Sequence, residues 1–254
     1  MIIRKSGAEI ETMARAGAVV AGTLALIEEH LEPGVSTGEL DALAEEFIRS
    51  KGGVPTFKGY KGYPAATCLS PNEMVVHGIP GPAQLRDGDI LSVDVGVTLD
   101  GFVADSAWTF PVGSIAPETQ RLLDVCRAAL EAGIEQARVG NTISDISQAV
   151  QTVTEDAGFG VIRSLVGHGV GRSMHEEPQV PNFVSRHRGP ELREGMTLAI
   201  EPMITIGVPE VYVHDDDWSI STTDASLAAH FEHTVAVTAE GPRVLTQRTG
   251  VLVR

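Results

Sequence analysis

Cysteine is scarce in this chain of 254 residues, which contains only Cys68 and Cys126. Their spacing has no paired pattern, which argues against a disulfide scaffold and for a reducing compartment. Residues 1–17 lack the unbroken apolar core of a signal peptide. No apolar run approaches the length needed to cross a bilayer. We therefore expect a cytoplasmic protein that does not enter a membrane.

Basic residues are also few, because 19 Lys and Arg stand against 34 Asp and Glu, a formal net charge of −15. The sequence shows no basic stripe, so nucleic-acid binding is not expected. It also lacks a basic or glycine-rich phosphate cradle, which argues against a general metallophosphatase. The excess acid favours solubility, and buried carboxylates around cations would contribute to it.

A linker is absent as well, because the 27 Gly and 14 Pro are dispersed along the chain. A chain of this length can bury a sizeable core, and we expect a single domain over residues 1–254. The apolar spacing predicts four amphipathic helices. They begin near Ser6, Ser36, Pro117 and Thr142. All but the third start with a capping-box pattern, in which an acidic side chain three residues on satisfies a free backbone donor.

The second and fourth helices are similar to each other in sequence. At one constant offset, Gly34, Ser36, Glu39, Leu40 and Gly52 match Gly140, Thr142, Asp145, Ile146 and Gly158. At nearly the same offset, Leu85–Gly88 matches Leu192–Gly195, and both lead into apolar strands, 90–95 and 197–200. Asp94 then falls on Glu201. Chance similarity of capped helices is the alternative, but the shared order favours a duplication, with repeats over about 6–112 and 117–238.

A hairpin is predicted at Asp100-Gly101, a strong two-residue turn flanked by apolar runs. If Leu99 pairs with Phe102, Asp94 and Asp105 become diagonal neighbours on one face of the sheet. Two converging carboxylates repel each other unless a positive charge lies between them. A solvated hairpin face is the alternative interpretation, and it is common for acidic pairs.

Three further residues have side chains that could ligate metal. Glu201 follows the apolar run 196–200, and Glu232 lies in the β-rich segment HFEHTVAV. His168 lies among Gly167, Gly169 and Gly171, which we expect to allow tight turns around the imidazole. Each residue alone is more often structural than functional.

Oxygen donors with one nitrogen suit Mn²⁺, Fe²⁺, Co²⁺ or Zn²⁺. Two such ions that share carboxylates and a water can promote hydrolysis. The residues themselves indicate a dinuclear hydrolase and nothing narrower.

Several motifs together carry a family resemblance. Asp94, Asp105, His168, Glu201 and Glu232 occur with HGVGRSMHEEPQVPN, YKGYPAATCLSPNEMVVHGIP, DGDILSVDVGV, DGFVADSAWTF, EGMTLAIEPM and FEHTVAVT. From about Ser6 to about Thr238, this order resembles the type I methionine aminopeptidases of peptidase family M24, in their short bacterial form. The resemblance implies the α/β (α+β) pita-bread fold, with pseudo-two-fold halves of antiparallel sheets backed by helices.

The resemblance assigns those five acidic and histidine residues as ligands of two divalent metals, Co, Mn, Fe or Zn. It implies that Asp94 chelates one metal and that Asp105 and Glu232 bridge both. His168 and Glu201 would complete the other metal's shell, with Glu201 also near the attacking water.

Two further histidines match the family's catalytic histidines that do not bind metal. The resemblance implies that His175 hydrogen-bonds the scissile carbonyl and its oxyanion. It implies that His77 contacts the substrate amide or the next residue. A solvent-exposed His77 is the alternative.

A methionine pocket is implied around Tyr60, Tyr63, Cys68 and Trp218, because a thioether packs well against aromatic faces. Cys68 could equally be a core residue. Phe57 stands where the family has a small residue or cysteine, and Met174 where it has an aromatic. Both remain apolar, so the size of the pocket is in question and its character is not.

The implied activity is removal of the N-terminal methionine from nascent proteins when the next residue is small, by attack of a metal-bridging water. The implied partners are nascent N-termini, with the ribosome as a candidate partner, and the enzyme would be a monomer. An Xaa-Pro aminopeptidase or dipeptidase is the first alternative, although such relatives resemble longer chains with an added N-terminal domain. A non-enzymatic pita-bread protein is the second, although such relatives have usually lost ligands.

Overall fold

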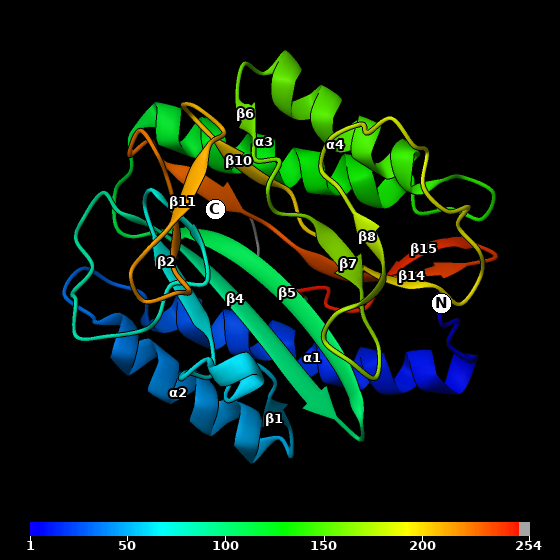
Figure 1. Cartoon of the computed structure of the whole chain (residues 1–254). Coiled ribbons are helices and arrows are strands. Elements are labelled where there is room, and N and C mark those ends of the chain that lie inside the picture. The colour runs from blue at the N-terminus through cyan, green and yellow to red at the C-terminus, as the bar shows by residue number, and fades with distance from the viewer. Residues whose placement is uncertain (249–254) are drawn as a thin grey trace.

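Figure 1 shows the computed structural model of the chain, which describes residues 1–248, with a long hairpin through its middle. β4 (Ile90–Leu99) and β5 (Phe102–Pro111) form this hairpin. Asp100 and Gly101 connect them with positive φ angles of 50° and 79°. Positive φ at both central residues gives the turn a twist that matches the strands, so the predicted hairpin is confirmed.

The register of the hairpin decides which carboxylates share a face. Gly96 pairs with Asp105, and Asp94 pairs with Ala107, as predicted. Directly opposed residues point to the same side, and so do residues two apart on one strand. Asp94 and Asp105 therefore lie on one face as diagonal neighbours.

The other strands extend this hairpin and form three more sheets in the described residues. β1 (Val54–Pro55) and β2 (Cys68–Pro71) both pair with β4. A five-stranded sheet has the order β15-β14-β9-β7-β8, with bounds Gly241–Val244, His233–Thr238, Thr197–Ile200, Gly167–Gly169 and Glu176–Val180. The order β13-β10-β6 joins Ala228–His230, Met203–Thr205 and Gly160–Val161, and the order β11-β12-β3 joins Val211–Val213, Ile220–Thr222 and Met74–Val76.

Helices cover the strands from opposite sides, with α1 and α2 below and α3 and α4 above in Figure 1. They are α1 (Gly7–His30), α2 (Thr37–Ser50), α3 (Pro117–Glu135) and α4 (Ile143–Asp156), with a short 3-10 turn at Tyr60–Gly62. The predicted capping boxes are present at the starts of α1, α2 and α4, and Pro117 opens α3. Each helix therefore begins where the sequence predicted.

α1 corrects one expectation from the sequence. It is long and apolar enough to cross a membrane by length and composition, so the statement that no apolar run approaches this length was wrong. Its apolar face packs instead against the hairpin, where Val20, Leu24 and Ile27 are fully buried in one cluster with Val93. The apolar residues of α1 thus line the core.

Equivalent loops make equivalent contacts in the two proposed repeats. Ser36 precedes α2 and forms an isolated β-bridge with Gln84. Thr142 precedes α4 and forms the corresponding bridge with Glu191. Both N-cap residues are extended, which leaves their backbone groups free to pair. These contacts support the proposed duplication.

Candidate metal centre and substrate pocket

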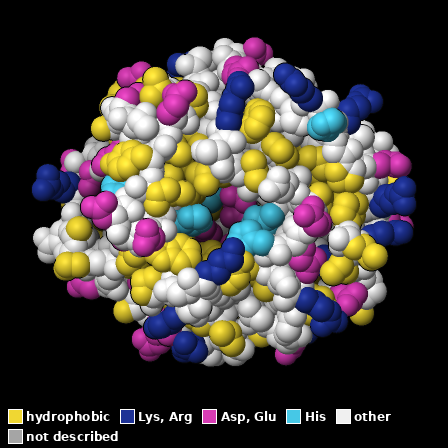
Figure 2. All heavy atoms as spheres, viewed as in Figure 1, with side chains coloured by type: hydrophobic (Ala, Val, Ile, Leu, Met, Phe, Trp, Pro, Cys, Tyr) yellow, Lys and Arg dark blue, Asp and Glu magenta, His cyan; other side chains and the backbone are white. Residues whose placement is uncertain are grey.

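A cavity of about 330 Å³ opens on the face shown in Figure 2, where histidine and acidic side chains gather in a central hollow. Every candidate site residue from the sequence lines this cavity. They are Phe57, Tyr60, Tyr63, Cys68, His77, Asp94, Asp105, His168, Met174, His175, Glu201, Trp218 and Glu232.

Three of the candidate ligands form a compact group. One ligand atom each from Asp105, His168 and Glu232 lies within 4.8 Å of the others. Asp105 and Glu232 are 2% exposed and His168 is 8% exposed. Carboxylates and an imidazole in this proximity are typical donors for a divalent transition metal.

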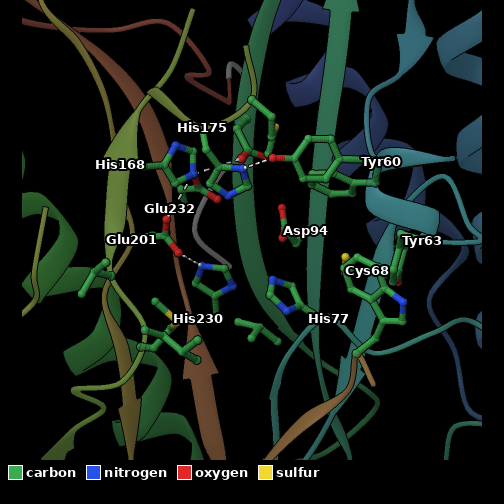
Figure 3. A pocket seen from close by; sticks show the side chains of 18 of the residues that line it. Tyr60, Tyr63, Cys68, His77, Asp94, His168, His175, Glu201, His230 and Glu232 are labelled. Carbon is green, nitrogen blue, oxygen red and sulfur yellow. Dashed lines mark hydrogen bonds and ion pairs between the residues drawn. The ribbon is translucent and has the colours of Figure 1, made fainter. Parts of the chain in front are cut away.

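The other two candidate ligands lie beside this group. Glu201 follows β9, and its Oε1 is 3.5 Å from His168 Nε2. Asp94 reaches into the cavity from β4, and its Oδ1 is buried although the residue as a whole is partly exposed. Figure 3 shows both carboxylates pointing into the cavity from opposite walls.

Hydrogen bonds between two distant segments hold Asp105 and Glu232 together. The Asp105 amide donates to Thr234 Oγ1 at 2.9 Å, and that hydroxyl donates to the Asp105 carbonyl at 2.7 Å. The Glu232 amide donates to the carbonyl of Ala107 at 2.8 Å. β5 and the start of β14 are thereby fixed side by side, with both carboxylates on the cavity side.

The glycines around His168 have a different role from the expected one. Gly167 and Gly169 lie in strand β7 and do not have positive φ, so the tight turns expected at these two residues were wrong, whereas the chain does bend from Gly171 to His175. A Cβ at Gly167 would lie 2.4 Å from the carbonyl oxygen of Ala199, and one at Gly169 would lie 2.3 Å from that of Glu177. Glycine is needed here because neighbouring backbones approach closely.

The tautomer of His168 follows from its hydrogen bond. Its Nδ1 lies 2.9 Å from the carbonyl oxygen of Gly169, which can only accept. Nδ1 therefore carries the proton, and Nε2 presents its lone pair to the carboxylates. Metal-ligating histidines are oriented in the same manner, with the second ring nitrogen donating to a carbonyl or carboxylate.

The electrostatics of the cavity fit a bound cation. Burial raises the pKa of Asp94 to about 7 and of Glu201 to about 8. Burial and the neighbouring carboxylates raise the pKa of Asp105 and Glu232 well above its usual range. Buried oxygens of Asp94, Asp105 and Glu232 also have no hydrogen-bond partner. A buried oxygen without a hydrogen-bond partner lowers the stability of the fold. A divalent metal ion would coordinate these oxygens and favour the ionised form of the carboxylates.

His175 and His77 approach the same cavity without belonging to the compact group. The Nδ1 of His175 lies 2.9 Å from the Tyr60 hydroxyl, and the two rings stack. The His77 ring lies edge-on to Trp218, with centroids 6.3 Å apart. Burial lowers the pKa of His77 to about 4. His77 is half-buried and lines the cavity, so the structure does not place it on the open surface.

The apolar end of the cavity is built from aromatic and sulfur-containing side chains. Phe57, Tyr63, Cys68 and Met174 are 2–7% exposed and belong to one cluster, against which Trp218 packs. Cys68 is thus both a core residue and a wall of the cavity. An apolar lining with polarisable groups suits an unbranched thioether.

Comparison with known proteins decides the family. Residues 11–239 match the model of metallopeptidase family M24. Methionine aminopeptidase 1 of Bacillus subtilis is 47% identical over 247 residues, which cover 97% of this chain and 100% of that protein. The methionine aminopeptidase of Clostridium perfringens is 48% identical over 97% of this chain and 99% of its own length.

This chain belongs to the methionine aminopeptidases of metallopeptidase family M24.

Solved structures of M24 proteins confirm the expected pita-bread fold. The crystal structure of methionine aminopeptidase from Thermotoga maritima matches with a TM-score of 0.95 and 43% identity, covering 97% of this chain and 100% of that one. The prolidase from Pyrococcus furiosus matches with a TM-score of 0.76 and 22% identity, covering 96% of this chain and 65% of that one. The second likeness shows the fold alone.

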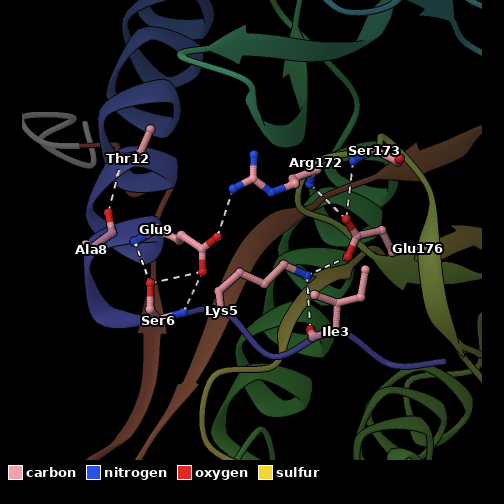
Figure 4. Close-up of polar contacts among 9 residues, drawn as sticks. All are labelled: Ile3, Lys5, Ser6, Ala8, Glu9, Thr12, Arg172, Ser173 and Glu176. Carbon is pink, nitrogen blue, oxygen red and sulfur yellow. Dashed lines mark hydrogen bonds and ion pairs between the residues drawn. The ribbon is translucent and has the colours of Figure 1, made fainter.

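An ion pair and two hydrogen bonds fix the loop of this M24 chain that carries Met174 and His175, both of which line the cavity. Figure 4 shows Lys5 reaching from the N-terminal segment to Glu176, with Nζ 2.5 Å from Oε2. Glu176 Oε1 accepts hydrogen bonds from the amides of Arg172 and Ser173, at 2.8 and 3.2 Å. The loop before β8 is therefore held by one distant side chain, Lys5, and by the local hydrogen bonds of Glu176.

Sequence reasoning missed one histidine of the cavity in this M24 chain. His230 ends β13, is 2% exposed and lines the cavity. Its Nε2 lies 3.6 Å from Glu201 Oε2. The available signal was its position two residues before Glu232, on the same strand-like segment. Alternation along an extended segment places both side chains on one face.

Proposed function

We propose that this M24 chain removes the N-terminal methionine from peptides and nascent proteins by metal-dependent hydrolysis. The observation that carries the proposal is a group of buried carboxylates and one oriented imidazole at the floor of an apolar cavity. Asp94, Asp105, His168, Glu201 and Glu232 would hold two divalent ions, with Co, Mn, Fe or Zn as candidates. When bound, such ions polarise a carbonyl and lower the pKa of water.

Glu201 acts as the general base and then as the general acid in this mechanism. Its carboxylate follows β9 at the cavity wall and has one oxygen toward His168 and the other toward His230. It accepts a proton from the attacking water and returns it to the leaving amine. A carboxylate at the cavity wall, within reach of the attacking water, can act as base and then as acid in this exchange.

His175 stabilises the charge that develops on the scissile carbonyl oxygen. If the Tyr60 hydroxyl donates to Nδ1, the ring proton resides on Nε2, which can then donate to the oxyanion. A donor placed where charge develops contributes roughly 3–4 kcal/mol in comparable sites. His77, on the opposite wall near Trp218, contacts the substrate amide or the next residue.

The apolar end of the cavity selects the methionine side chain. Tyr60, Tyr63 and Trp218 provide aromatic faces, and Cys68 and Met174 provide sulfur contacts. Phe57 also lines this end, and its ring packs directly against Gly96. We further propose that the residue after methionine is small, in keeping with the family.

We also propose that the enzyme acts in the cytoplasm as a monomer on emerging N-termini, with the ribosome as a candidate partner. Both cysteines are buried and free, which fits a reducing compartment.

One assay tests the proposal. Metal-free protein is titrated with Co²⁺, Mn²⁺ or Fe²⁺ and offered Met-Ala-, Leu-Ala- and Xaa-Pro-peptides. We expect metal-dependent release of methionine in preference to leucine, and no preference for the residue before proline. Preferential release of the residue before proline would support the Xaa-Pro alternative. Absence of any metal-dependent release would support the non-enzymatic one.

A further inference from the structure

His230 is a buried histidine with no satisfied ring nitrogen. Its side chain is 2% exposed, and neither Nδ1 nor Nε2 has a hydrogen-bond partner. Buried polar groups are nearly always paired, so each exception requires an explanation. Figure 3 shows the ring inside the cavity, between Glu201 and His77.

The backbone holds this ring in the cavity. The His230 amide donates to Thr109 Oγ1 at 2.9 Å, and the same hydroxyl donates to the His230 carbonyl at 2.9 Å. On its other side, His230 pairs with Met203 of β10. β5 and β10 therefore both fix the backbone from which this side chain enters the cavity.

Glu201 lies between two imidazoles that face different oxygens. Oε1 is 3.5 Å from His168 Nε2, and Oε2 is 3.6 Å from His230 Nε2. Both separations slightly exceed the range of a good hydrogen bond. A small rotation of the Glu201 carboxylate toward His230 would bring Oε2 within hydrogen-bonding distance of His230 Nε2.

The two imidazoles differ in what they can offer Glu201. His168 Nε2 has a lone pair, because its proton is held on Nδ1 by the Gly169 carbonyl. His230 has no such constraint, and an imidazole always carries at least one N–H. A proton on His230 Nε2 is therefore directed at Oε2, while Oε1 is left on the side of His168.

We propose that His230 is a positioning residue, which donates from Nε2 to Oε2 of Glu201 and so presents Oε1 to the metal centre. This rests on the proposed function. The approach of His230 Nε2 to Glu201 Oε2, at 3.6 Å, favours a hydrogen-bonding role toward this carboxylate over direct ligation. Such outer partners orient ligating side chains, and their loss typically weakens metal binding or activity about 10–100-fold.

Two substitutions separate the roles that His230 could have. The side-chain amide of His230→Gln can donate from near the position of Nε2 but is a poor transition-metal ligand. His230→Leu keeps most of the volume and removes the donor. Ile204→Val, a conservative change at a fully buried residue of the adjacent β10, controls for altered packing.

The readouts are Co²⁺ affinity of the metal-free protein by calorimetry, the visible Co²⁺ spectrum, and kcat and KM for a Met-Ala-peptide. We expect His230→Leu to weaken Co²⁺ binding and lower kcat by about 10–100-fold, with KM changed less than about threefold. His230→Gln and Ile204→Val should stay within about threefold of the unmodified chain. A Leu variant that behaves like the unmodified chain, or a Gln variant as impaired as Leu, would overturn the positioning role.

A metal-free measurement separates this inference from the proposed function. Ring ¹H–¹⁵N spectra of the metal-free protein should show His230 protonated at Nε2, with a signal that shifts in Glu201→Ala. Protonation at Nδ1 alone, or no response to Glu201→Ala, would refute the hydrogen bond even if the enzyme releases methionine. Protonation at Nε2, with a signal that shifts in Glu201→Ala, would support the hydrogen bond even if the enzyme does not release methionine.

Discussion

Lys5 and Glu176 form a buried ion pair, with Nζ 2.5 Å from Oε2 and side chains only 3% and 8% exposed. Glu176 follows His175 directly and also accepts two backbone amides of the same loop. A residue near the N-terminus thereby fixes the loop that carries the proposed oxyanion donor. Most surface ion pairs contribute little to stability, but this one is desolvated.

Lys5→Met should therefore destabilise the protein strongly. Removing one partner leaves a buried carboxylate unpaired, which costs about 3–5 kcal/mol. Lys58→Met is the matched control, because Lys58 pairs with Glu45 but its side chain is 43% exposed; the expected cost is at most about 1 kcal/mol. Urea unfolding measures both. Equal losses in the two variants would show that the Lys5 pair has no special role.

Metal removal should lower stability in a pH-dependent manner. In the metal-free chain, burial raises the pKa of Asp94 to about 7 and of Glu201 to about 8. A carboxyl with a raised folded-state pKa stabilises the fold at low pH, and this contribution is lost as pH rises through that value. The metal-free protein should thus have a lower Tm at pH 8.5 than at pH 6.

The check is calorimetry in EDTA and in Co²⁺ at both pH values. Co²⁺ should raise Tm more at pH 8.5, because the ionised carboxylates then need a counter-charge. Asp94→Asn serves as the comparison, since it removes one titrating group and should weaken the pH dependence of the metal-free Tm. A metal effect that is identical at both pH values would contradict the account.

Gly96→Ala should disturb the methionine pocket. A Cβ at this position would lie 2.8 Å from Cε1 of Phe57, so the ring must shift. We expect KM for Met-Ala-peptides to rise at least about fivefold. The loss or gain of contacts equivalent to one methylene group in an apolar pocket changes the free energy of binding by roughly 1–3 kcal/mol. Gly81→Ala is the control, since a Cβ there meets no atom within 4 Å. An unchanged KM in Gly96→Ala would place Phe57 outside the pocket.

His175→Ala should reduce kcat with little change in KM. The imidazole is proposed to act on charge that appears only during the reaction, and loss of such a donor costs about 10²–10³ in kcat. Tyr60→Phe should give a smaller loss of the same kind, because it removes the hydroxyl 2.9 Å from His175 Nδ1. Steady-state kinetics of both variants measure the split. A rise in KM at constant kcat would instead assign His175 to ground-state binding.

Features with a local physical cause could be predicted from the sequence. The capping boxes at Ser6, Ser36 and Thr142 and the Asp100-Gly101 turn each depend on residues within a few positions, and all are present. The hairpin register follows from the turn, so the shared face of its two acidic residues could be derived as well.

Features created by contacts between distant segments could not be derived in this way. Gly167 and Gly169 were expected to lie in turns, but they lie in a strand. The sequence does not show that the carbonyls of Ala199 and Glu177 approach them, which is why these positions need glycine. His230 was missed for the same reason, since its contact with Glu201 depends on β9 and β13 meeting at one cavity. The detailed ligand and catalytic roles came from the family resemblance and stay predictions.

In the proposed function, five residues form one metal-dependent hydrolytic centre. The most direct measurement titrates metal-free protein with Co²⁺ and follows bound metal and methionine release together, with His168→Ala beside the unmodified chain. We predict that release appears only as metal binds, with up to two equivalents bound. His168→Ala should lose release and bind metal more weakly while still unfolding cooperatively. Full release in the presence of chelator, or full activity in His168→Ala, would contradict the account.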